Sequence, residues 1–304
     1  MRSYAQNFED VRLARVLGDM DAGFYIDVGA AHPTSDSVTR HFYELGWHGI
    51  NIEPNAGLFA ELQRERPRDI NLEVACSSSN GVASLHETDA LDGWATLSTD
   101  TARFIEEHHG RAVHAREVRT VTLASVCAEH VASPIDFLKV DAEAHETAVL
   151  EGADFTRWRP RIVVVEATWP HSRTASHQEW EPLLLAAGYQ FAVFDGVNRF
   201  YIAVAGEHGD WAERLAEPIS VFDDWELDRY LNQVESLRTR AGEQDAAMQA
   251  AVAERDQARR AAEHWETEYR HRVDGSIRMP AGLVGAIRSA AGRGRAAAAR
   301  RGRR

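Results

Sequence analysis

The chain has 304 residues, of which 44 % are hydrophobic, enough for one large domain or one and a half average ones with a substantial core. Its formal net charge is −13 even though seven arginines lie between Arg288 and Arg304, so the rest is more acidic still and no nucleic-acid partner is expected. Two cysteines imply no disulfide framework, and the lack of a long apolar run or a hydrophobic N-terminal segment predicts a cytoplasmic protein without a transmembrane segment.

The first predicted strand, Phe24–Val28, leads into a turn of small residues. Its continuous apolar run is typical of a strand buried on both faces of a parallel sheet. The following residues, Gly29-Ala30-Ala31, carry no large side chain, so a ligand can approach the backbone there. Because ligands of open α/β sheets bind beyond the carboxyl ends of the strands, we expect a nucleotide-like cofactor at this turn.

Strand-like and helix-like segments alternate from Phe24 to about Val204. This rhythm predicts an α/β fold with helices on both faces of a mostly parallel seven-stranded sheet. The last two strands are separated only by residues 195–198, so they should form an antiparallel hairpin. The predicted strands are Phe24–Val28, Gly49–Glu53, Ile70–Ala75, Phe137–Asp141, Arg161–Glu166, Phe191–Asp195 and Arg199–Val204. The predicted helices are Ser35–Leu45, Ala56–Glu65, His145–Leu150 and His177–Ala187.

An insertion from about His86 to Arg119 interrupts this rhythm. The segment is polar, contains several histidines and has few strand signals, and one helix is expected near Thr101–His109. Because the insertion follows the third predicted strand, it lies on the ligand edge of the sheet. Two interpretations remain open, a lid over the site and a surface excursion.

The C-terminal part has a different character. Residues 225–270 contain no proline and are rich in alanine, glutamate, glutamine and arginine, which predicts a long exposed helix or a short coiled coil through which the chain self-associates. The last two dozen residues are expected to form a disordered basic tail. The predicted division is therefore a main domain at 1–222, the long helix at 223–272 and the tail at 273–304.

Acidic residues end four of the predicted strands, namely Asp27, Glu53, Asp141 and Glu166. An isolated buried charge is costly, so a carboxylate at such a point needs hydrogen-bond donors nearby. One helix and one strand separate Asp27 from Glu53, which places Glu53 on the neighbouring strand, facing the same crevice. A carboxylate in that position accepts hydrogen bonds from both hydroxyls of a ribose.

The glycine pattern separates two kinds of cofactor. A dinucleotide site favours GxGxxG, whereas here the second and third glycines are missing and Pro33 removes an amide donor. A pyrophosphate would be poorly held, which disfavours an NAD(P)-dependent oxidoreductase. S-adenosylmethionine has no phosphate, and it can be assigned moiety by moiety: its amino-acid end to Asp27 and the turn at Gly29 and Ala30, its ribose to Glu53, and its adenine to Ala75, Cys76 and Ser77.

Five motifs occur in the order found in a known family. They are SYAQNFEDVRLARVL at 3–17, FYIDVGAAHPTSDSVTRHFYELGWHGINIEPN at 24–55, RPRDINLEVACS at 66–77, DFLKVDAEAHETAVLEGADFTRWRPRIVVVEAT at 136–168 and GYQFAVFDGVNRFYIA at 188–203. Through them the chain resembles the FkbM family of S-adenosylmethionine-dependent methyltransferases over about residues 3–222.

The resemblance implies a class I methyltransferase fold, which is a Rossmann-like three-layer sandwich. It also implies S-adenosylmethionine as cofactor and a hydroxyl acceptor on a sugar, glycan or polyketide-type metabolite. By the same resemblance the N-terminal motif folds over the cofactor, with Gln6 as the expected contact.

One residue departs from the family pattern. Ala144 stands where the family commonly has glycine after the fourth strand. If the backbone there has positive φ, alanine costs on the order of 1 kcal/mol. If it is helical instead, alanine is the better residue, and we expect this second case.

Methyl transfer to a hydroxyl requires alignment of the acceptor, exclusion of water and a general base. The candidates for the base are Asp141, which is favoured, and Glu143, His145, Glu166 and His171. Lys139 is expected on the same strand face as Asp141. The acids suit Mg²⁺ as ligands, but nothing in their spacing demands a metal.

Two further expectations concern the acceptor and an alternative role. Trp94, Trp169 and Trp180 are candidates for stacking on a sugar ring at the ligand edge. The competing hypothesis is a non-catalytic scaffold that retains the methyltransferase fold for binding.

Overall fold

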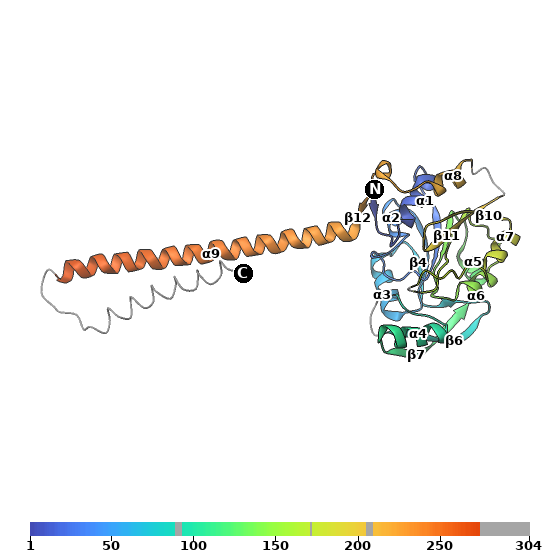
Figure 1. Ribbon diagram of the computed structural model, residues 1–304, viewed down its shortest axis with the longest axis horizontal. Helices are drawn as coiled ribbons and strands as arrows, with labels where there is room; N and C mark the ends of the chain where they lie inside the picture. The colour runs from blue at the N-terminus through green and yellow to red at the C-terminus, as the bar shows by residue number, and fades with distance from the viewer. Residues whose placement is uncertain (89–92, 171, 205–208, 274–304) are drawn as a thin grey trace. The chain divides into compact units, whose positions relative to one another are not determined.

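The computed structural model describes residues 1–88, 93–170, 172–204 and 209–273 (Figure 1). Its contacts divide the chain into two compact units, Met1–Gln233 and Val234–Arg304. Within the described residues, no helix combines the length and the apolar character needed to cross a membrane.

The centre of the first unit is a seven-stranded sheet. In spatial order its strands are β10 (Tyr189–Phe194), β11 (Asn198–Ala203), β9 (Ile162–Glu166), β8 (Phe137–Val140), β2 (Phe24–Val28), β3 (His48–Ile52) and β4 (Ile70–Leu72). Strand β11 is antiparallel to both of its neighbours, and every other pair is parallel. The predicted mostly parallel sheet with a terminal antiparallel hairpin is thus confirmed.

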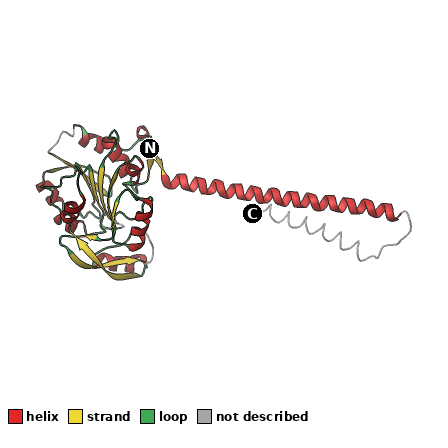
Figure 2. Ribbon diagram, turned by 180° about the vertical axis from the view of Figure 1, so that it is seen from behind, coloured by secondary structure: helices red, strands yellow, loops and turns green. Residues whose placement is uncertain are grey.

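Both faces of this sheet are covered by helices (Figure 2). Successive strand residues alternate between two hydrophobic clusters, so that Tyr25 and Phe137 belong to one and Ile26 and Leu138 to the other. Residues of α1 (Glu9–Leu17), α2 (Arg40–Glu44) and α8 (Trp211–Ala216) complete the first cluster, and residues of α5 (Leu123–His130), α6 (Glu146–Glu151) and α7 (Glu181–Ala186) complete the second. The molecule therefore has the expected three layers.

A second sheet was not predicted. It consists of β5 (Ala75–Cys76), β7 (Val113–Val121) and β6 (Gly81–Thr88), and α4 (Thr99–His109) lies between its two long strands in the chain. Helix α4 confirms the helix predicted near Thr101–His109. The prediction that the insertion has few strands was wrong, because β6 and β7 run through it. Most of their side chains are exposed or half-buried, so the hydrophobic signal is weak. The predicted strand Ile70–Ala75 is also split, because β4 ends at Leu72 and Ala75 joins the second sheet.

The two ends of the first unit are joined by backbone and ionic contacts. Strand β1 (Arg2–Ser3) pairs in parallel with β12 (Glu226–Leu227), and the η1 turn (Val221–Asp223) precedes β12. Arg15 on α1 binds Asp223 at 2.5 Å. Residues 221–228 are thus part of the packing of the first unit.

Two more helices complete the description. Helix α3 (Ala56–Glu65) has the predicted bounds, and the Asn55 side chain caps it by accepting hydrogen bonds from the Gly57 and Leu58 amides. Helix α9 (Asp228–Val273) is the predicted long helix, and most of its residues are exposed. The predicted basic tail lies outside the described residues.

Candidate active site

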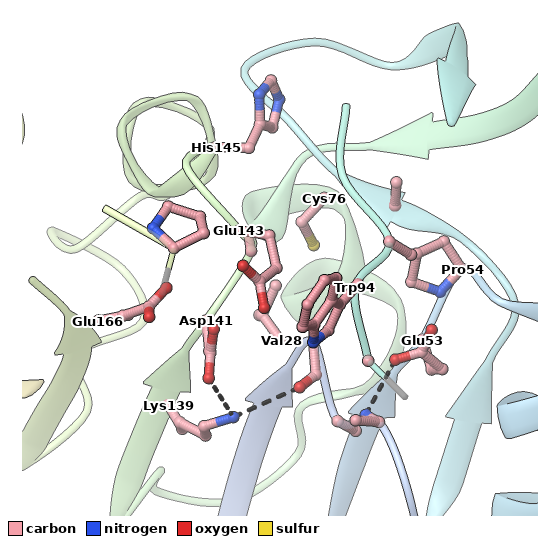
Figure 3. A pocket seen from close by; sticks show the side chains of 18 of the residues that line it. Val28, Glu53, Pro54, Cys76, Trp94, Lys139, Asp141, Glu143, His145 and Glu166 are labelled. Atoms are coloured by element: carbon pink, nitrogen blue, oxygen red, sulfur yellow. Dashed lines mark hydrogen bonds and ion pairs between the residues drawn. The ribbon is translucent and has the colours of Figure 1, made fainter. Parts of the chain in front are cut away.

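A cavity of about 460 Å³ lies at the carboxyl ends of the central strands (Figure 3). This volume is within the range of cofactor and ligand pockets. The sequence-predicted site residues that line it are Gln6, Gly29, Ala30, Glu53, Ala75, Cys76, Asp141, Glu143, His145 and Glu166. Lys139, Trp94 and Arg173 line it as well.

The turn after β2 is tightly packed. Gly29 has φ +75°, and a Cβ there would come within 1.7 Å of the Asp141 carbonyl oxygen. Only glycine therefore allows the ends of β2 and β8 to approach each other. The amides of Gly29 and Ala30 both donate to the Ile52 carbonyl, which fixes the turn against β3.

Glu53 forms one wall of the cavity just beyond the end of β3. Its carboxylate accepts hydrogen bonds from the Ala31 amide at 2.9 Å and the Asn55 amide at 2.8 Å. Burial raises the pKa of Glu53 to about 7. These two amides hold the carboxylate at the cavity edge, where the sequence places the ribose contact.

Asp27 was predicted to contact the ligand, but it is not among the residues that line the cavity. Only 1 % of the residue is exposed. On β2 it follows Ile26, and since strand side chains alternate, it points to the opposite face of the sheet from Ile26. Its carboxylate accepts a hydrogen bond from the Thr39 hydroxyl at 3.1 Å and lies 3.7 Å from the Lys139 ammonium.

Lys139 is a buried cation on the floor of the cavity. Its Nζ lies 3.2 Å from Asp141 Oδ2 and donates to the Gly29 carbonyl at 3.4 Å. Burial alone would lower the pKa of Lys139, but the charges of Asp141 and Asp27 outweigh it and raise this pKa above its ordinary value. The lysine thus remains charged and orients Asp141, and Figure 3 shows the ion pair between them.

Three carboxyl groups gather beside this lysine. Oxygens of Asp141, Glu146 and Glu166 lie within 4.8 Å of one another. Burial, then the neighbouring negative charges, hold the pKa of Glu166 well above its ordinary value, and burial raises the pKa of Glu146 to about 7. Either protons or a divalent cation with oxygen ligands, such as Mg²⁺, can offset this excess negative charge.

The partners within this cluster differ. Glu146 Oε1 accepts the Ala142 amide at 2.9 Å, whereas one oxygen of Glu166, Oε2, is buried without a hydrogen-bond partner among the described residues. Glu166 is therefore the group in the cluster that most needs a proton or a ligand.

His145 and Glu143 lie on the loop between β8 and α6. The His145 Nε2 is 3.1 Å from the Ser77 hydroxyl, and burial lowers the pKa of the histidine, so it is neutral at pH 7. In Figure 3 it lies apart from the Asp141–Lys139 pair. The expected helical backbone at Ala144 is wrong, because φ is +71° there and +50° at Glu143. His171 lies outside the described residues.

The second sheet and the segment before α4 form the other wall. Leu85 and Trp94 line the cavity, and the Trp94 ring is held by the Arg111 guanidinium at 4.4 Å and the edge of the His109 ring. The Thr96 hydroxyl donates to the Glu143 carbonyl at 2.6 Å, which ties the insertion to the loop between β8 and α6. Within the described residues the insertion is a wall of the site, and not merely a surface excursion.

The other two tryptophans do not line the cavity. Trp180 is 1 % exposed and belongs to the core, which corrects its assignment to the ligand edge. Trp169 is exposed. Arg173 lines the cavity but was not predicted from the sequence, because a single arginine in a loop belongs to no recognisable motif.

The lining fits S-adenosylmethionine. The apolar side chains of Val74, Ala75, Cys76 and Leu85 offer a surface for adenine, and Glu53 offers a fixed acceptor for a ribose diol. The acidic floor at Asp141 suits a cationic ligand.

Comparison with known proteins agrees with this geometry. Residues 27–191, more than half of the chain, match the methyltransferase FkbM domain. No curated protein matches the chain.

Solved structures similar to the chain include a TehB-like SAM-dependent methyltransferase from Corynebacterium glutamicum, with 8 % identity and a TM-score of 0.35 over 64 % of this chain and 87 % of that one. A fibrillarin pre-rRNA processing protein from Methanococcus jannaschii has 12 % identity and a TM-score of 0.34 over 65 % and 76 %. The METTL16 methyltransferase domain has 11 % identity and a TM-score of 0.31, and the match covers 62 % of this chain and 63 % of that one. At such scores these likenesses carry no argument, and the assignment rests on the domain match: the chain belongs to the FkbM methyltransferase family, with S-adenosylmethionine as its cofactor.

Proposed function

We propose that the protein transfers the methyl group of S-adenosylmethionine to a hydroxyl oxygen of a saccharide, glycan or secondary metabolite. The observation that carries this proposal is the Lys139–Asp141–Glu166 arrangement on the cavity floor, which places an oriented carboxylate beside the cofactor region. The strand order, with one antiparallel strand next to the edge, supports a class I methyltransferase architecture. A cytoplasmic location is part of the same proposal.

The proposed cofactor contacts follow the lining of the cavity. Glu53 accepts hydrogen bonds from the ribose hydroxyls, and Ala75 and Cys76 contact the adenine. Gly29, Ala30, Gln6 and Asp141 surround the methionine end. Asp27, being absent from the lining, contributes by holding Lys139.

Bound S-adenosylmethionine supplies an electrophilic methyl group on a sulfonium. The role left to the protein is to orient the acceptor, exclude water and remove a proton. Asp141 accepts the hydroxyl proton while Lys139 keeps its carboxylate in place. Burial and the neighbouring carboxylates raise the pKa of Glu166 and so favour its protonated form, which can donate a hydrogen bond to Asp141 or to the acceptor. Glu143 and His145 contact the acceptor from the loop before α6, and the Trp94 wall excludes water.

The acceptor class is supported by polar groups at the open side of the cavity together with one aromatic ring. Glu143, Thr168 and Arg173 offer hydrogen bonds to hydroxyls, and the Trp94 ring offers a face for stacking on a sugar.

Calorimetry with S-adenosylhomocysteine tests the cofactor site. The unaltered protein should bind, and Glu53→Ala should weaken binding at least tenfold because the diol loses two charge-assisted hydrogen bonds. Glu65→Ala, at the exposed end of α3, is the matched control and should leave binding unchanged. Equal binding by all three proteins, or tight binding of NADH in place of S-adenosylhomocysteine, contradicts the assignment.

A second measurement separates an enzyme from a scaffold. Asp141→Asn should retain S-adenosylhomocysteine binding within a few fold but lower kcat by about 10²–10⁴ with a saccharide acceptor, because the general base is lost. Binding without turnover of any hydroxyl acceptor by the unaltered protein would favour the scaffold.

A further inference from the structure

Helix α9, which Figure 1 shows as a long ribbon, carries a row of large apolar side chains that are exposed. Val234 is 44 % exposed, Leu237 55 %, Met248 69 % and Trp265 66 %. Most helices gain their stability from the packing of an apolar face rather than from intrinsic propensity, so a 46-residue helix with such a row needs a partner.

The row follows a heptad repeat. With Val234 at position a, the a positions are Val234, Ala241, Met248, Arg255, Ala262 and Tyr269. The d positions are Leu237, Gln244, Ala251, Ala258 and Trp265. Of these eleven positions between Val234 and Tyr269, only Gln244 and Arg255 are not apolar, and the 3–4 spacing holds over five heptads, which is the pattern of a coiled coil.

We propose that α9 pairs with α9 of a second copy of this chain as an antiparallel coiled coil centred on Ala253. In that register Met248 and Trp265 each meet a small residue, and Leu237 lies opposite the partner's Tyr269. Met248 lies opposite the partner's Ala258, and Trp265 lies opposite the partner's Ala241. Alternation of large and small side chains across facing positions fills such a core without voids.

The polar core positions fit the same register. Arg255 lies opposite the partner's Ala251, and Gln244 lies opposite the partner's Ala262, so each long polar side chain can extend past a methyl group toward water. In a parallel pair, by contrast, Arg255 would face the partner's Arg255 in the core, and Trp265 would face the partner's Trp265. Like charges and two bulky rings in single layers disfavour that arrangement.

The flanking charges complement each other in the antiparallel register. At the e positions Arg238 meets the partner's Glu266, and Asp245 meets the partner's Arg259. At the g positions Arg240 meets the partner's Glu268. The one like-charge contact is Glu254 with the partner's Glu254 at the two-fold axis, where Val252 also meets the partner's Val252. Shifting the partner by one heptad brings like charges together in either direction, as Arg238 with the partner's Arg259 or as Asp245 with the partner's Glu266, so the charges select this register.

Light scattering coupled to size exclusion tests the association. The chain of 33.9 kDa should elute with twice that mass, and a chain ending at Gln233 should be monomeric. Ala258→Glu should weaken dimerisation on the order of a hundredfold because it buries a carboxylate against the partner's Met248. Ala253→Glu, on the outward f position, carries the same helix-propensity change and should remain dimeric.

The direction of pairing is tested by a distance between spin labels. Cys76 and Cys127 are buried, so Thr239→Cys provides one exposed labelling site on α9. An antiparallel pair centred on Ala253 separates the two labels by roughly 40 Å, since each lies fourteen residues from the axis at 1.5 Å per residue. A parallel pair would bring them within roughly 20 Å.

Several outcomes would overturn the proposal. They are a monomer at every concentration, a dimer that survives either Ala258→Glu or removal of α9, a mass above that of a dimer, and the short label distance. Circular dichroism and S-adenosylhomocysteine binding of each variant show whether the rest of the chain remains folded, so loss of pairing is distinguished from unfolding.

Discussion

At the scale of single residues, the loop between β8 and α6 contains a conformation that its sequence does not favour. Ala144 has φ +71°, a conformation that is strained for a residue with a Cβ and unstrained for glycine. We therefore expect Ala144→Gly to raise the free energy of unfolding by about 0.5–1 kcal/mol in urea titrations. Ala148→Gly, inside α6, is the control and should lower it by a similar amount. A loss of stability at position 144 would contradict this reading of the loop.

Glu146 gives a pH dependence whose sign can be worked out. Its pKa is about 7 in the folded chain and near the ordinary 4.5 when unfolded, because burial disfavours the charged form. The folded state therefore binds more protons between these values. The resulting stabilisation is fully present below about pH 4.5 and is lost as the pH rises through 7.

Glu146→Gln should make this decline shallower, by up to about 1.4 kcal/mol per pH unit, while keeping an acceptor for the Ala142 amide. Urea titrations at pH 5, 6, 7 and 8 measure the slope. Glu65→Gln, which is exposed, should not change it, and an unaltered slope for Glu146→Gln would count against the raised pKa.

At the scale of elements, one buried lysine joins β2 to β8. Lys139→Met removes the counterion of Asp27 and Asp141, and we expect a loss of about 3 kcal/mol of stability. Asp27→Asn in the same chain should recover about 1 kcal/mol or more, because the buried carboxylate no longer needs a cation. Thermal unfolding of the single and double variants gives the coupling free energy between Lys139 and Asp27. Strict additivity of the two substitutions would show that the pair does not interact.

The sequence predicts most of the central sheet because buried parallel strands are continuous apolar runs. Helix α3 was predicted to the residue, and in the structure the Asn55 side chain caps its first turn. Strands β6 and β7 were missed because their side chains are largely solvated and leave little hydrophobic pattern.

Within the candidate site, the residues at the cavity edge were largely anticipated, but their orientation was not. Asp27 is absent from the cavity lining, because its buried carboxylate is directed to Thr39 and Lys139. Lys139 was anticipated as a neighbour of Asp141, yet its role as a counterion for two strands depends on the register of β2 against β8. Such register is a property of the folded sheet and is not visible in a single strand.

At the scale of the whole molecule, the position of a truncation should decide whether the first unit stays folded. A chain ending at Gln233 retains β12 and Asp223 and should keep the thermal stability and S-adenosylhomocysteine binding of the full chain. A chain ending at residue 222 loses the Arg15–Asp223 pair and the β1–β12 pairing, and we expect its midpoint to fall by several degrees. Differential scanning calorimetry of both truncated chains measures their thermal unfolding midpoints. Equal midpoints would contradict this prediction.

Lys139 is also the single lysine of the chain. Among the side chains of this sequence, acylating reagents aimed at primary amines therefore have one target, an ammonium enclosed between two carboxylates. Peptide mass spectrometry after a timed exposure to the reagent would then measure the rate at which Lys139 becomes accessible to solvent, and no engineered label is needed.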